Sequence, residues 1–269
     1  MKLNIVMVGV LAVAAGCATD DGTAGDDPAT GQTEQAVSSD VFGYYTCRNA
    51  AQSAAYDCQW NVSGPLSYCI LSGVSGNLRG LSVIGDFASV GGNYNYAAIS
   101  LAGTTGPVTA DLACVSIHDE VVVMGADSAD PSNPAANAPA DNPNRRCYLT
   151  GIQGQDGAFG HAGDGATITQ RRDGSWHLSA HTTTGSLHAW AVCLNVTSWG
   201  PDQAWSQSSG VNSGIVGTNT PGGMACGLTD LEGVFDASDT DNGVTMRYLS
   251  PYWDWTFLGN HRAITECFR

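Results

Sequence analysis

The stretch Cys69-Ile-Leu-Ser-Gly-Val-Ser-Gly76 occurs in two further versions along this chain, as Cys147-Tyr-Leu-Thr-Gly-Ile-Gln-Gly154 and Cys226-Gly-Leu-Thr-Asp-Leu-Glu-Gly233. The shared pattern is C-x-L-[ST]-[GD]-[VIL]-x-G, and successive copies begin 78 and 79 residues apart. A repeat of this length is typical of one supersecondary unit that is used several times. We therefore expect either an array of similar units or a body with pseudo-threefold symmetry.

Each copy ends on a second cysteine, 41 to 46 residues after the first. We infer that the two cysteines of a copy form a disulfide that joins its opening strand to its closing strand. Closing a ~45-residue loop stabilises a small unit by about 4 kcal/mol in the chain-entropy model. Disulfides also indicate an oxidising compartment. The expected pairs are Cys69 with Cys114, Cys147 with Cys193, Cys226 with Cys267 and, as a local fourth pair, Cys47 with Cys58.

The chain from residue 41 onward has the pattern of antiparallel β-structure. No apolar period of 3.6 residues lasts beyond two turns, and Gly, Ser, Thr and Asn interrupt the chain at short intervals. The last part of each copy predicts a hairpin. Strand alternation in the second copy predicts that Trp176, Leu178 and Ala180 face a core while His177, Ser179 and His181 face solvent. The predicted hairpin strands are 94–101 with 108–114, 176–181 with 187–193, and 253–258 with 262–267.

The sequence thus predicts an all-β fold of three disulfide-closed antiparallel units of about 75 residues each, pseudo-threefold or arrayed. We place the units at residues 41–117, 118–196 and 197–269. The pattern leaves open whether the units surround a common axis or follow one another as separate beads.

Residues 1–16 carry one positive charge and then an apolar run that is too short to span a bilayer, which predicts an export signal. The sequence Ala14-Ala15-Gly16-Cys17 resembles the lipobox of bacterial lipoproteins, although that family usually has leucine where Ala14 stands. The resemblance implies that Cys17 is lipidated and becomes the first residue of the mature chain. The other cysteines can all pair, which leaves Cys17 as the odd one. The alternative is ordinary cleavage after small residues, near Ala18.

Residues 17–40 contain six acids, no basic residue and few side chains large enough to bury, which predicts a disordered acidic tether. The whole chain has 25 acidic against 10 basic residues and a formal net charge of −15. This charge repels nucleic acids and anionic lipid headgroups, so contact with a membrane is expected only through the lipid anchor.

Short catalytic motifs are absent from the sequence, including H-E-x-x-H, G-x-S-x-G, C-x-x-C and the P-loop. Four of the six histidines lie in the second copy. Two of them, His177 and His181, share a strand face but stand ~13 Å apart along it, so surface histidines are favoured over a transition-metal site. A dispersed hydrolase site would draw on acids of this copy. The histidines are His161, His177, His181 and His188, and the acids are Asp156, Asp164 and Asp173.

One acidic loop has the hard oxygen ligands that calcium prefers. It contains Asp236, Asp239, Asp241 and Asn242 just before a glycine. The loop lacks the strict alternation of a calcium-binding loop and a clear bidentate acid after it. An acidic surface turn is therefore the favoured interpretation. Binding of calcium by this loop is the alternative, and calcium is the one cofactor that the sequence suggests.

Aromatic residues recur in the first strand of each predicted hairpin, where they are expected to fill the core. Three tryptophans, Trp60, Trp199 and Trp205, lie outside this spacing. Aromatic faces flanked by carboxylates and amides bind sugars, because a pyranose ring has an apolar face and a polar rim. These three tryptophans are therefore the expected positions of an exposed ligand-binding surface.

The repeat motif also resembles the C-x-L-T-G-[VI]-x-G modules of exported bacterial proteins, mostly of unassigned function, some of them adhesin-like. The resemblance rests on eight positions per copy and implies no catalytic residue. The expectation is an exported lipoprotein at the outer membrane or cell surface that acts as an adhesin-like or carbohydrate-binding module without catalysis. A secreted hydrolase of polysaccharide or peptide and a structural envelope component remain as alternatives.

Overall fold

The computed structural model describes eighteen strands and, within the residues given at the end of this paragraph, no helix. All pairing is antiparallel, so the predicted all-β class is confirmed. The described ranges are 41–49, 56–63, 67–78, 82–90, 94–102, 108–116, 122–128, 135–140, 142–155, 157–196, 203–206, 211–216, 225–235, 243–249, 252–258 and 261–268.

The strands fall into three consecutive groups of six. The first group is β1 (Val41–Asn49), β2 (Tyr56–Ser63), β3 (Ser67–Gly76), β4 (Ser82–Val90), β5 (Tyr94–Ala102) and β6 (Val108–Ser116). The second is β7 (Val122–Asp127), β8 (Ala135–Ala138), β9 (Arg145–Gln155), β10 (Gly165–Gln170), β11 (Trp176–His181) and β12 (Ser186–Asn195). The third is β13 (Gln203–Ser206), β14 (Val211–Val216), β15 (Ala225–Gly233), β16 (Gly243–Leu249), β17 (Tyr252–Leu258) and β18 (His261–Phe268).

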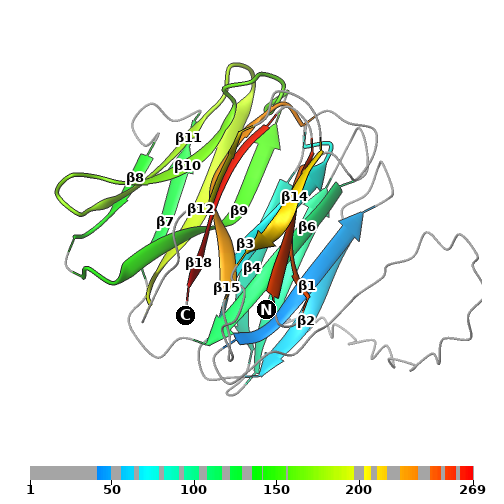
Figure 1. Cartoon of the computed structure of the whole chain (residues 1–269), viewed down its shortest axis with the longest axis vertical. Coiled ribbons are helices and arrows are strands. Elements are labelled where there is room, and N and C mark those ends of the chain that lie inside the picture. The colour runs from blue at the N-terminus through cyan, green and yellow to red at the C-terminus, as the bar shows by residue number, and fades with distance from the viewer. Residues whose placement is uncertain are drawn as a thin grey trace, which may run out of the picture.

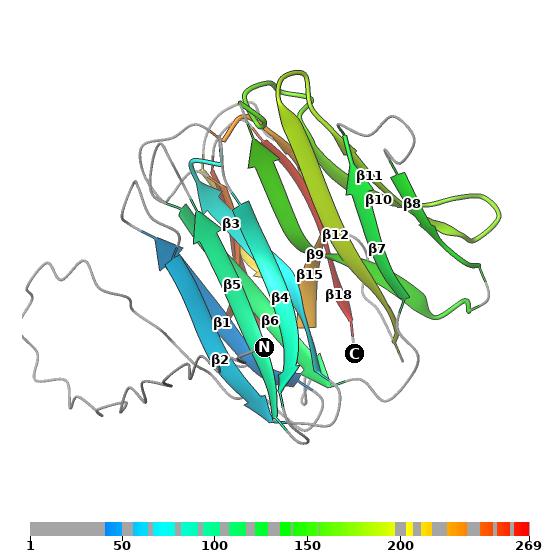
Figure 2. The same cartoon turned by 180° about the vertical axis from the view of Figure 1, so that it is seen from behind.

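Three six-stranded sheets are built from these groups (Figures 1 and 2). Sheet I has the order β1-β6-β3-β16-β17-β14, sheet II β2-β5-β4-β9-β12-β7, and sheet III β13-β18-β15-β10-β11-β8. Within each group the first strand pairs with the sixth, the sixth with the third, the second with the fifth and the fifth with the fourth. Each sheet therefore joins three strands of one group to three of another, and an arrangement of separate beads is excluded.

The predicted hairpins at the ends of the three copies are wrong. Their strands, β5 and β6, β11 and β12, and β17 and β18, follow one another in the chain but belong to different sheets. Each closing strand pairs instead with the opening strand that carries its partner cysteine. A turn rich in Gly and Thr signals that the chain reverses, but it does not specify that the flanking strands share hydrogen bonds. Here the reversal carries the chain from one sheet to another.

The structure contains the three disulfides that close the copies: Cys69–Cys114, Cys147–Cys193 and Cys226–Cys267. In each pair the cysteines are direct partners in the register of two neighbouring strands, with Cα atoms 3.9 to 4.0 Å apart. Cys47 and Cys58 lie on β1 and β2, where their side chains are outside the described part. Their pairing stays a prediction.

A β-bulge at the same motif position in each copy explains the three-residue spacing of the apolar residues within the motif. The register shifts at Ser72, Thr150 and Thr229, the [ST] position of each copy. One extra residue reverses the alternation of side chains, so the motif leucine and the aliphatic residue three positions later face the same side. All six of these apolar side chains are buried: Leu71, Val74, Leu149, Ile152, Leu228 and Leu231.

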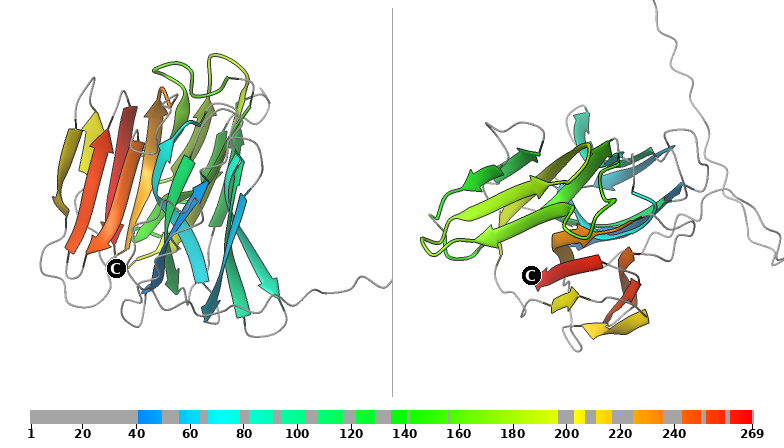
Figure 3. Two further views of the ribbon diagram at one scale, coloured as in Figure 1. Left: turned by 90° about the vertical axis from the view of Figure 1, so that its right-hand side faces the viewer. Right: turned by 90° about the horizontal axis from the view of Figure 1, so that it is seen from above.

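The opening strands β3, β9 and β15 contact one another at the centre of the molecule. Viewed from above, the blue-to-cyan, green and yellow-to-red parts of the chain lie around this centre (Figure 3). The second motif position brings Ile70, Tyr148 and Gly227 together. A Cβ on Gly227 would lie 2.6 Å from Cδ1 of Ile70 and 2.8 Å from Cδ1 of Tyr148. Glycine at this position therefore makes room for the tyrosine ring, which stacks on Phe268 with ring centroids 4.5 Å apart.

The loops that come after the three opening strands form a second buried contact. The backbone N–H of Leu78 donates to the carbonyl of Phe235 at 2.9 Å, and the N–H of Phe235 donates to the carbonyl of Phe159 at 3.0 Å. The rings of Phe159 and Phe235 pack edge to face, with centroids 5.5 Å apart. Phe159 has a φ of 61°, a left-handed conformation that is uncommon outside glycine. These bonds and its burial hold it there and tie the loops of three chain segments together.

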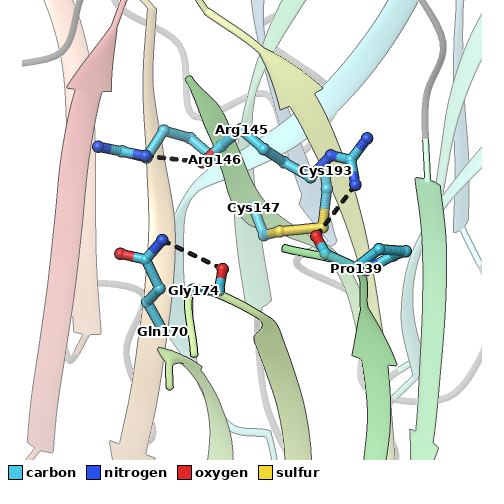
Figure 4. Close-up of a disulfide and its surroundings, with 7 residues drawn as sticks. All are labelled: Pro139, Arg145, Arg146, Cys147, Gln170, Gly174 and Cys193. Carbon is cyan, nitrogen blue, oxygen red and sulfur yellow. Dashed lines mark hydrogen bonds between the residues drawn. A yellow bond between two sulfur atoms is a disulfide. The ribbon is translucent and has the colours of Figure 1, made fainter. Parts of the chain in front are cut away.

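A buried ion pair joins the second and third groups, and its arginine, Arg146, lies near the Cys147–Cys193 disulfide (Figure 4). Nε of Arg146 lies 3.1 Å from Oε1 of Glu266, and its guanidinium also stands over the ring of Trp176 at 5.7 Å. Nη1 of Arg146 donates to the carbonyl of Arg145 at 2.7 Å, and Nη1 of Arg145 donates to the carbonyl of Pro139 at 3.1 Å. Hydrogen bonds of this kind offset the cost of burying guanidinium groups.

The second group is a sandwich of two half-sheets. β7 and β12 of sheet II pack against β8 and β11 of sheet III. Trp176, Leu178 and Ala180 of β11 are buried and the side chains between them are not, so the predicted alternation is confirmed. The same alternation in β12 buries Leu187, Ala189 and Ala191 and leaves the residues between them on the opposite, solvent-exposed face.

In sheet III, β10 of the second group pairs with β15 of the third group. Gly165 lies at this contact, so a substitution there tests how closely the two strands approach. An added Cβ would lie 2.3 Å from the carbonyl oxygen of Leu231 and 2.7 Å from Cα of Glu232, and no side-chain rotation relieves that overlap. We expect Gly165→Ala to lower the free energy of unfolding by roughly 2–4 kcal/mol in urea titrations. Gly163→Ala is the matched control, because nothing lies within 4 Å of its added Cβ. Equal stability of the two variants would contradict the pairing.

The central contact is tested by Gly227→Ala. The added methyl group meets Ile70 and Tyr148, and overpacking of this kind costs about 1–3 kcal/mol. Ile70→Val removes the methyl group that the new Cβ would strike, so it should cost less in the Gly227→Ala background than in the wild type. A coupling energy of at least about 0.5 kcal/mol in the double-mutant cycle is expected. Strictly additive effects would mean that the two positions do not meet.

Candidate functional site

Among the side chains of sheet II that the structure describes, the exposed face of β7, β9 and β12 carries one large aromatic residue, Trp190. Its neighbours in β12, Ala189 and Ala191, are fully buried, so strand alternation directs the indole to the opposite face, where it is partly exposed. Its Cα partners are Gly125 on β7 and Gly151 on β9. The bulge at Thr150 lies directly beside this position. The direct partners of Trp190 on the two neighbouring strands therefore have no side chain, and the nearest bulged residue is the partly exposed Thr150.

Gly125 and His188 fix how the indole lies. A Cβ on Gly125 would be 3.6 Å from Cδ1 of Trp190 and 3.8 Å from Nε1, so the ring edge reaches over the glycine. The imidazole of His188, two residues earlier on the same strand, is nearly parallel to the indole, with 6.1 Å between centroids and 14° between planes. The two rings therefore lie next to each other along β12 with nearly parallel planes.

Polar groups border these rings. Nδ1 of His188 lies 3.3 Å from Oδ2 of Asp127, and the two side chains are 31% and 27% exposed. The end of β7 is held beside β12 by two bonds: Ser128 N–H donates to the carbonyl of Leu187 at 2.8 Å, and Leu187 N–H donates to Oγ of Ser128 at 2.7 Å. On the other side, Gln153 of β9 is the Cα partner of His188.

We call this surface the Trp190 platform; it consists of Val123, Gly125, Asp127, Gln153, His188 and Trp190. Val123 has a side chain that is 67% exposed, which adds apolar area at one end. The combination of an indole, an imidazole, a carboxylate and an amide suits the apolar face and the hydroxyl rim of a sugar.

Sheet III carries a second cluster of titratable groups. Nη2 of Arg262 lies 3.0 Å from Oδ2 of Asp230, and Nη1 lies 3.2 Å from Oε2 of Glu232. Nε2 of His181 stands 3.7 Å from Oε1 of Glu232, across the position of Gly165. Asp230 is buried, whereas Arg262 and His181 are about half exposed. Asp230 stands where the other two copies have Gly73 and Gly151.

The environment of Asp230 favours its neutral form. Burial raises the pKa of this carboxyl to about 7, the nearby charge of Glu232 acts in the same direction, and Arg262 opposes both. The two carboxylates share one guanidinium and do not face each other across a space for a substrate. This arrangement suits an ion-pair cluster better than an acid and base pair for hydrolysis.

The four histidines of the second group have separate partners. His161 lies 3.6 Å from Asp164, His181 is next to Glu232, and His188 is next to Asp127. Nδ1 of His177 contacts Arg171 and Asn137, each at 2.8 Å, and burial followed by the charge of Arg171 lowers the pKa of its imidazole. Among the described residues no three His, Cys, Asp or Glu side chains converge as a metal site would require.

The acids proposed for a hydrolase have structural roles where they are described. Asp164 is fully buried, and its carboxylate accepts hydrogen bonds from the N–H groups of Thr183 at 2.6 Å and His161 at 3.0 Å. Burial would raise the pKa of Asp164, but these bonds outweigh it and the pKa lies below its ordinary value. Asp173 accepts bonds from Ser175 within an exposed turn. Asp156 lies outside the described residues.

Several predicted site residues lie outside the described part of the chain. These are Cys17, Trp199 and the acidic loop with Asp236, Asp239, Asp241 and Asn242. Trp60 lies on β2 and Trp205 on β13, but their side chains are not described. Trp190 is not among the residues that the sequence singles out, because this tryptophan lies within the spacing of the repeat. The signal was present in the sequence Leu187-His-Ala-Trp-Ala191, where small and apolar residues alternate with large polar or aromatic ones.

Comparison with known proteins found no matching family, no similar curated protein and no similar solved structure. The described residues contain no helix that could cross a membrane. The three disulfides are typical of proteins in an oxidising compartment.

The raised pKa of Asp230 predicts how stability depends on pH. Folded Asp230 keeps its proton up to about pH 7, while an unfolded aspartic acid loses it near pH ~4. Between these values the folded state binds the extra proton, so raising the pH lowers the free energy of unfolding. Over this pH range the loss of stability is on the order of a few kcal/mol, and Asp230→Asn should remove it in urea titrations at successive pH values. Parallel curves for wild type and variant would show that Asp230 titrates normally.

Proposed function

We propose that this protein is an exported, lipid-anchored surface protein that binds a glycan without modifying it, through the Trp190 platform. The observation that carries the proposal is the partly exposed indole of Trp190, whose Cα partners on both neighbouring strands are glycines and beside which the imidazole of His188 lies nearly parallel. An aromatic face left open in this way is costly in water and favourable against the apolar face of a sugar.

The scaffold supports binding by holding the platform rigid. β12 has a strand on both sides, and the disulfide between Cys147 and Cys193 fixes it against β9 close to the site. A surface that is already ordered loses little entropy when a ligand binds. A glycoside hydrolase would require two facing carboxylates, whereas Asp230 and Glu232, which lie close together, are both held by Arg262.

The lipobox-like Ala14-Ala15-Gly16-Cys17 and the acidic segment 17–40 support the rest of this proposal. The lipid on Cys17 would anchor the chain at the outer membrane or cell surface, and the segment would act as a spacer. We further propose that the folded part arose by triplication of a disulfide-closed unit of about 75 residues with pseudo-threefold symmetry. The recurrence of the same strand pairing in all three groups supports this origin.

Replacement of Trp190 tests the function. The mature chain should bind individual glycans on a glycan array. Trp190→Ala should weaken the affinity for these glycans at least about tenfold in calorimetric titrations, because the aromatic contact is lost. Trp190→Phe should keep part of the affinity.

His181→Ala serves as the control, since His181 is an exposed ring-bearing residue that lies on sheet III. Non-reducing peptide mapping should find the same disulfides in all variants. If Trp190→Ala binds glycans with unchanged affinity, the binding site lies elsewhere. If the wild-type protein binds no glycan on the array, the proposed function is wrong.

A further inference from the structure

We infer that the cluster of Asp230, Glu232, Arg262 and His181 is a pH-sensitive latch, which holds the second group to the third at acid pH and loosens as the pH rises. The cluster lies where β10 pairs with β15, a junction of three residue pairs. His181 belongs to β11 of the second group, whereas the two acids and the arginine belong to β15 and β18 of the third. The latch is separate from the Trp190 platform, which lies on sheet II.

The groups meet at equivalent junctions, and only this junction has carboxylates at its paired positions. Asp230 and Glu232 are the fifth and seventh residues of the repeat motif. The second copy has Gly151 and Gln153 at these positions, where they pair with β4 of the first group. The first copy also has no titratable residue there. Strands of different groups can therefore pair without acids, and the two carboxylates add a response to pH at one junction.

Asp230 is the buried member of the cluster, and its environment suits a neutral acid. Its side chain is 4% exposed, and its Oδ2 lies 3.0 Å from Nη2 of Arg262. Among the described residues no group donates a hydrogen bond to Oδ1. The hydroxyl of Thr167, the Cα partner of Asp230 on β10, lies instead 2.7 Å from Oγ of Ser179. A buried carboxylate with one oxygen unpaired is costly, so the protonated form is favoured while the junction is closed.

The other members of the cluster act in the same direction. Glu232 uses the same guanidinium as Asp230, with its Oε2 at 3.2 Å from Nη1 of Arg262. Ionisation of Asp230 places a second negative charge beside Glu232, with one guanidinium for both. Nε2 of His181 lies 3.7 Å from Oε1 of Glu232 and attracts it only when the imidazole is protonated, which acid pH favours. Acid pH therefore strengthens the contact on both sides of the junction.

The charges that act on Asp230 are those of Glu232 and Arg262. Glu266, on the same strand as Arg262, pairs with Arg146 instead. The strands β10 and β13 contain no titratable residue. The other titratable residues on the strands packed around β15 and β10 are Tyr68, Asp111, Arg145, Tyr148, His177 and His261, of which His261 has a side chain outside the described part.

The direction of the response follows from where the proton is bound. Burial raises the pKa of Asp230 to about 7 in the closed junction. Opening exposes the carboxyl to water, where the pKa of an aspartic acid is ~4. Between these values the closed junction binds a proton that the open junction releases, so opening becomes easier as the pH rises through this window. Below the window both forms hold the proton, and above it neither does.

Amide hydrogen exchange on the full mature chain tests the latch by comparing two junctions of one molecule. The opening constant is the exchange rate divided by the intrinsic rate at the same pH. From about pH 5 to about pH 8 we expect it to rise at least about tenfold more at β10–β15 than at β4–β9. The β4–β9 junction is the internal control, because none of its paired residues is titratable. An equal rise at both junctions, or no rise at either, would overturn the latch.

Variants assign the response to Asp230. Asp230→Asn should abolish the excess rise at β10–β15, and Asp230→Gly, which introduces the residue of the other two copies, should do the same if the asparagine variant does not fold. Asp173→Asn is the matched control and should keep the excess rise, because Asp173 accepts its hydrogen bonds from Ser175 in an exposed turn. A full excess rise in a folded Asp230 variant would show that another group carries the response and would overturn the latch.

Discussion

The register between each opening strand and its closing strand is the constraint on which the rest of the structure depends. In all three groups the disulfide joins residues that are direct partners, so the bond fixes the pairing of the whole strands β3–β6, β9–β12 and β15–β18. The bulge that follows then determines which side chains of the motif face the core. Because the three opening strands also contact one another, an error of one residue in any of them would disturb the common centre.

The Trp190 platform is a consequence of this same register. Pairing of β12 with β9 places Gly151 beside the indole, and pairing with β7 places Gly125 on its other side. Equivalent positions on the other closing strands carry Asp111, which is buried and bonded to Thr46, and Ile264, next to the Asp230 cluster. One scaffold position therefore presents three different chemistries. Among the three described closing strands, only β12 has an aromatic ring at this position, with glycines as its Cα partners on both sides.

The sequence predicts the β class, the three described disulfides and the faces of β11, because each depends on local alternation or on the repeat itself. It does not predict which strands pair across the groups. That pairing depends on close backbone approaches such as Gly165 against Leu231, and an isolated glycine looks the same in a turn and at such a contact. The incorrect hairpins have the same origin, since turn residues specify a reversal and not a partner. The alternation of Leu187, Ala189 and Ala191 with His188 and Trp190 does predict that Trp190 faces away from the core.

The central claim is that strands from different groups pair directly and that consecutive closing strands do not form hairpins. Cross-strand proton contacts measured by NMR on the full chain test it most directly, because antiparallel partners bring backbone protons close together. The account predicts contacts between Val83 and Ile152, between Ala166 and Leu231, and between Val244 and Val74. Backbone contacts along β11 and β12 in a hairpin register, with none at those three pairs, would contradict it.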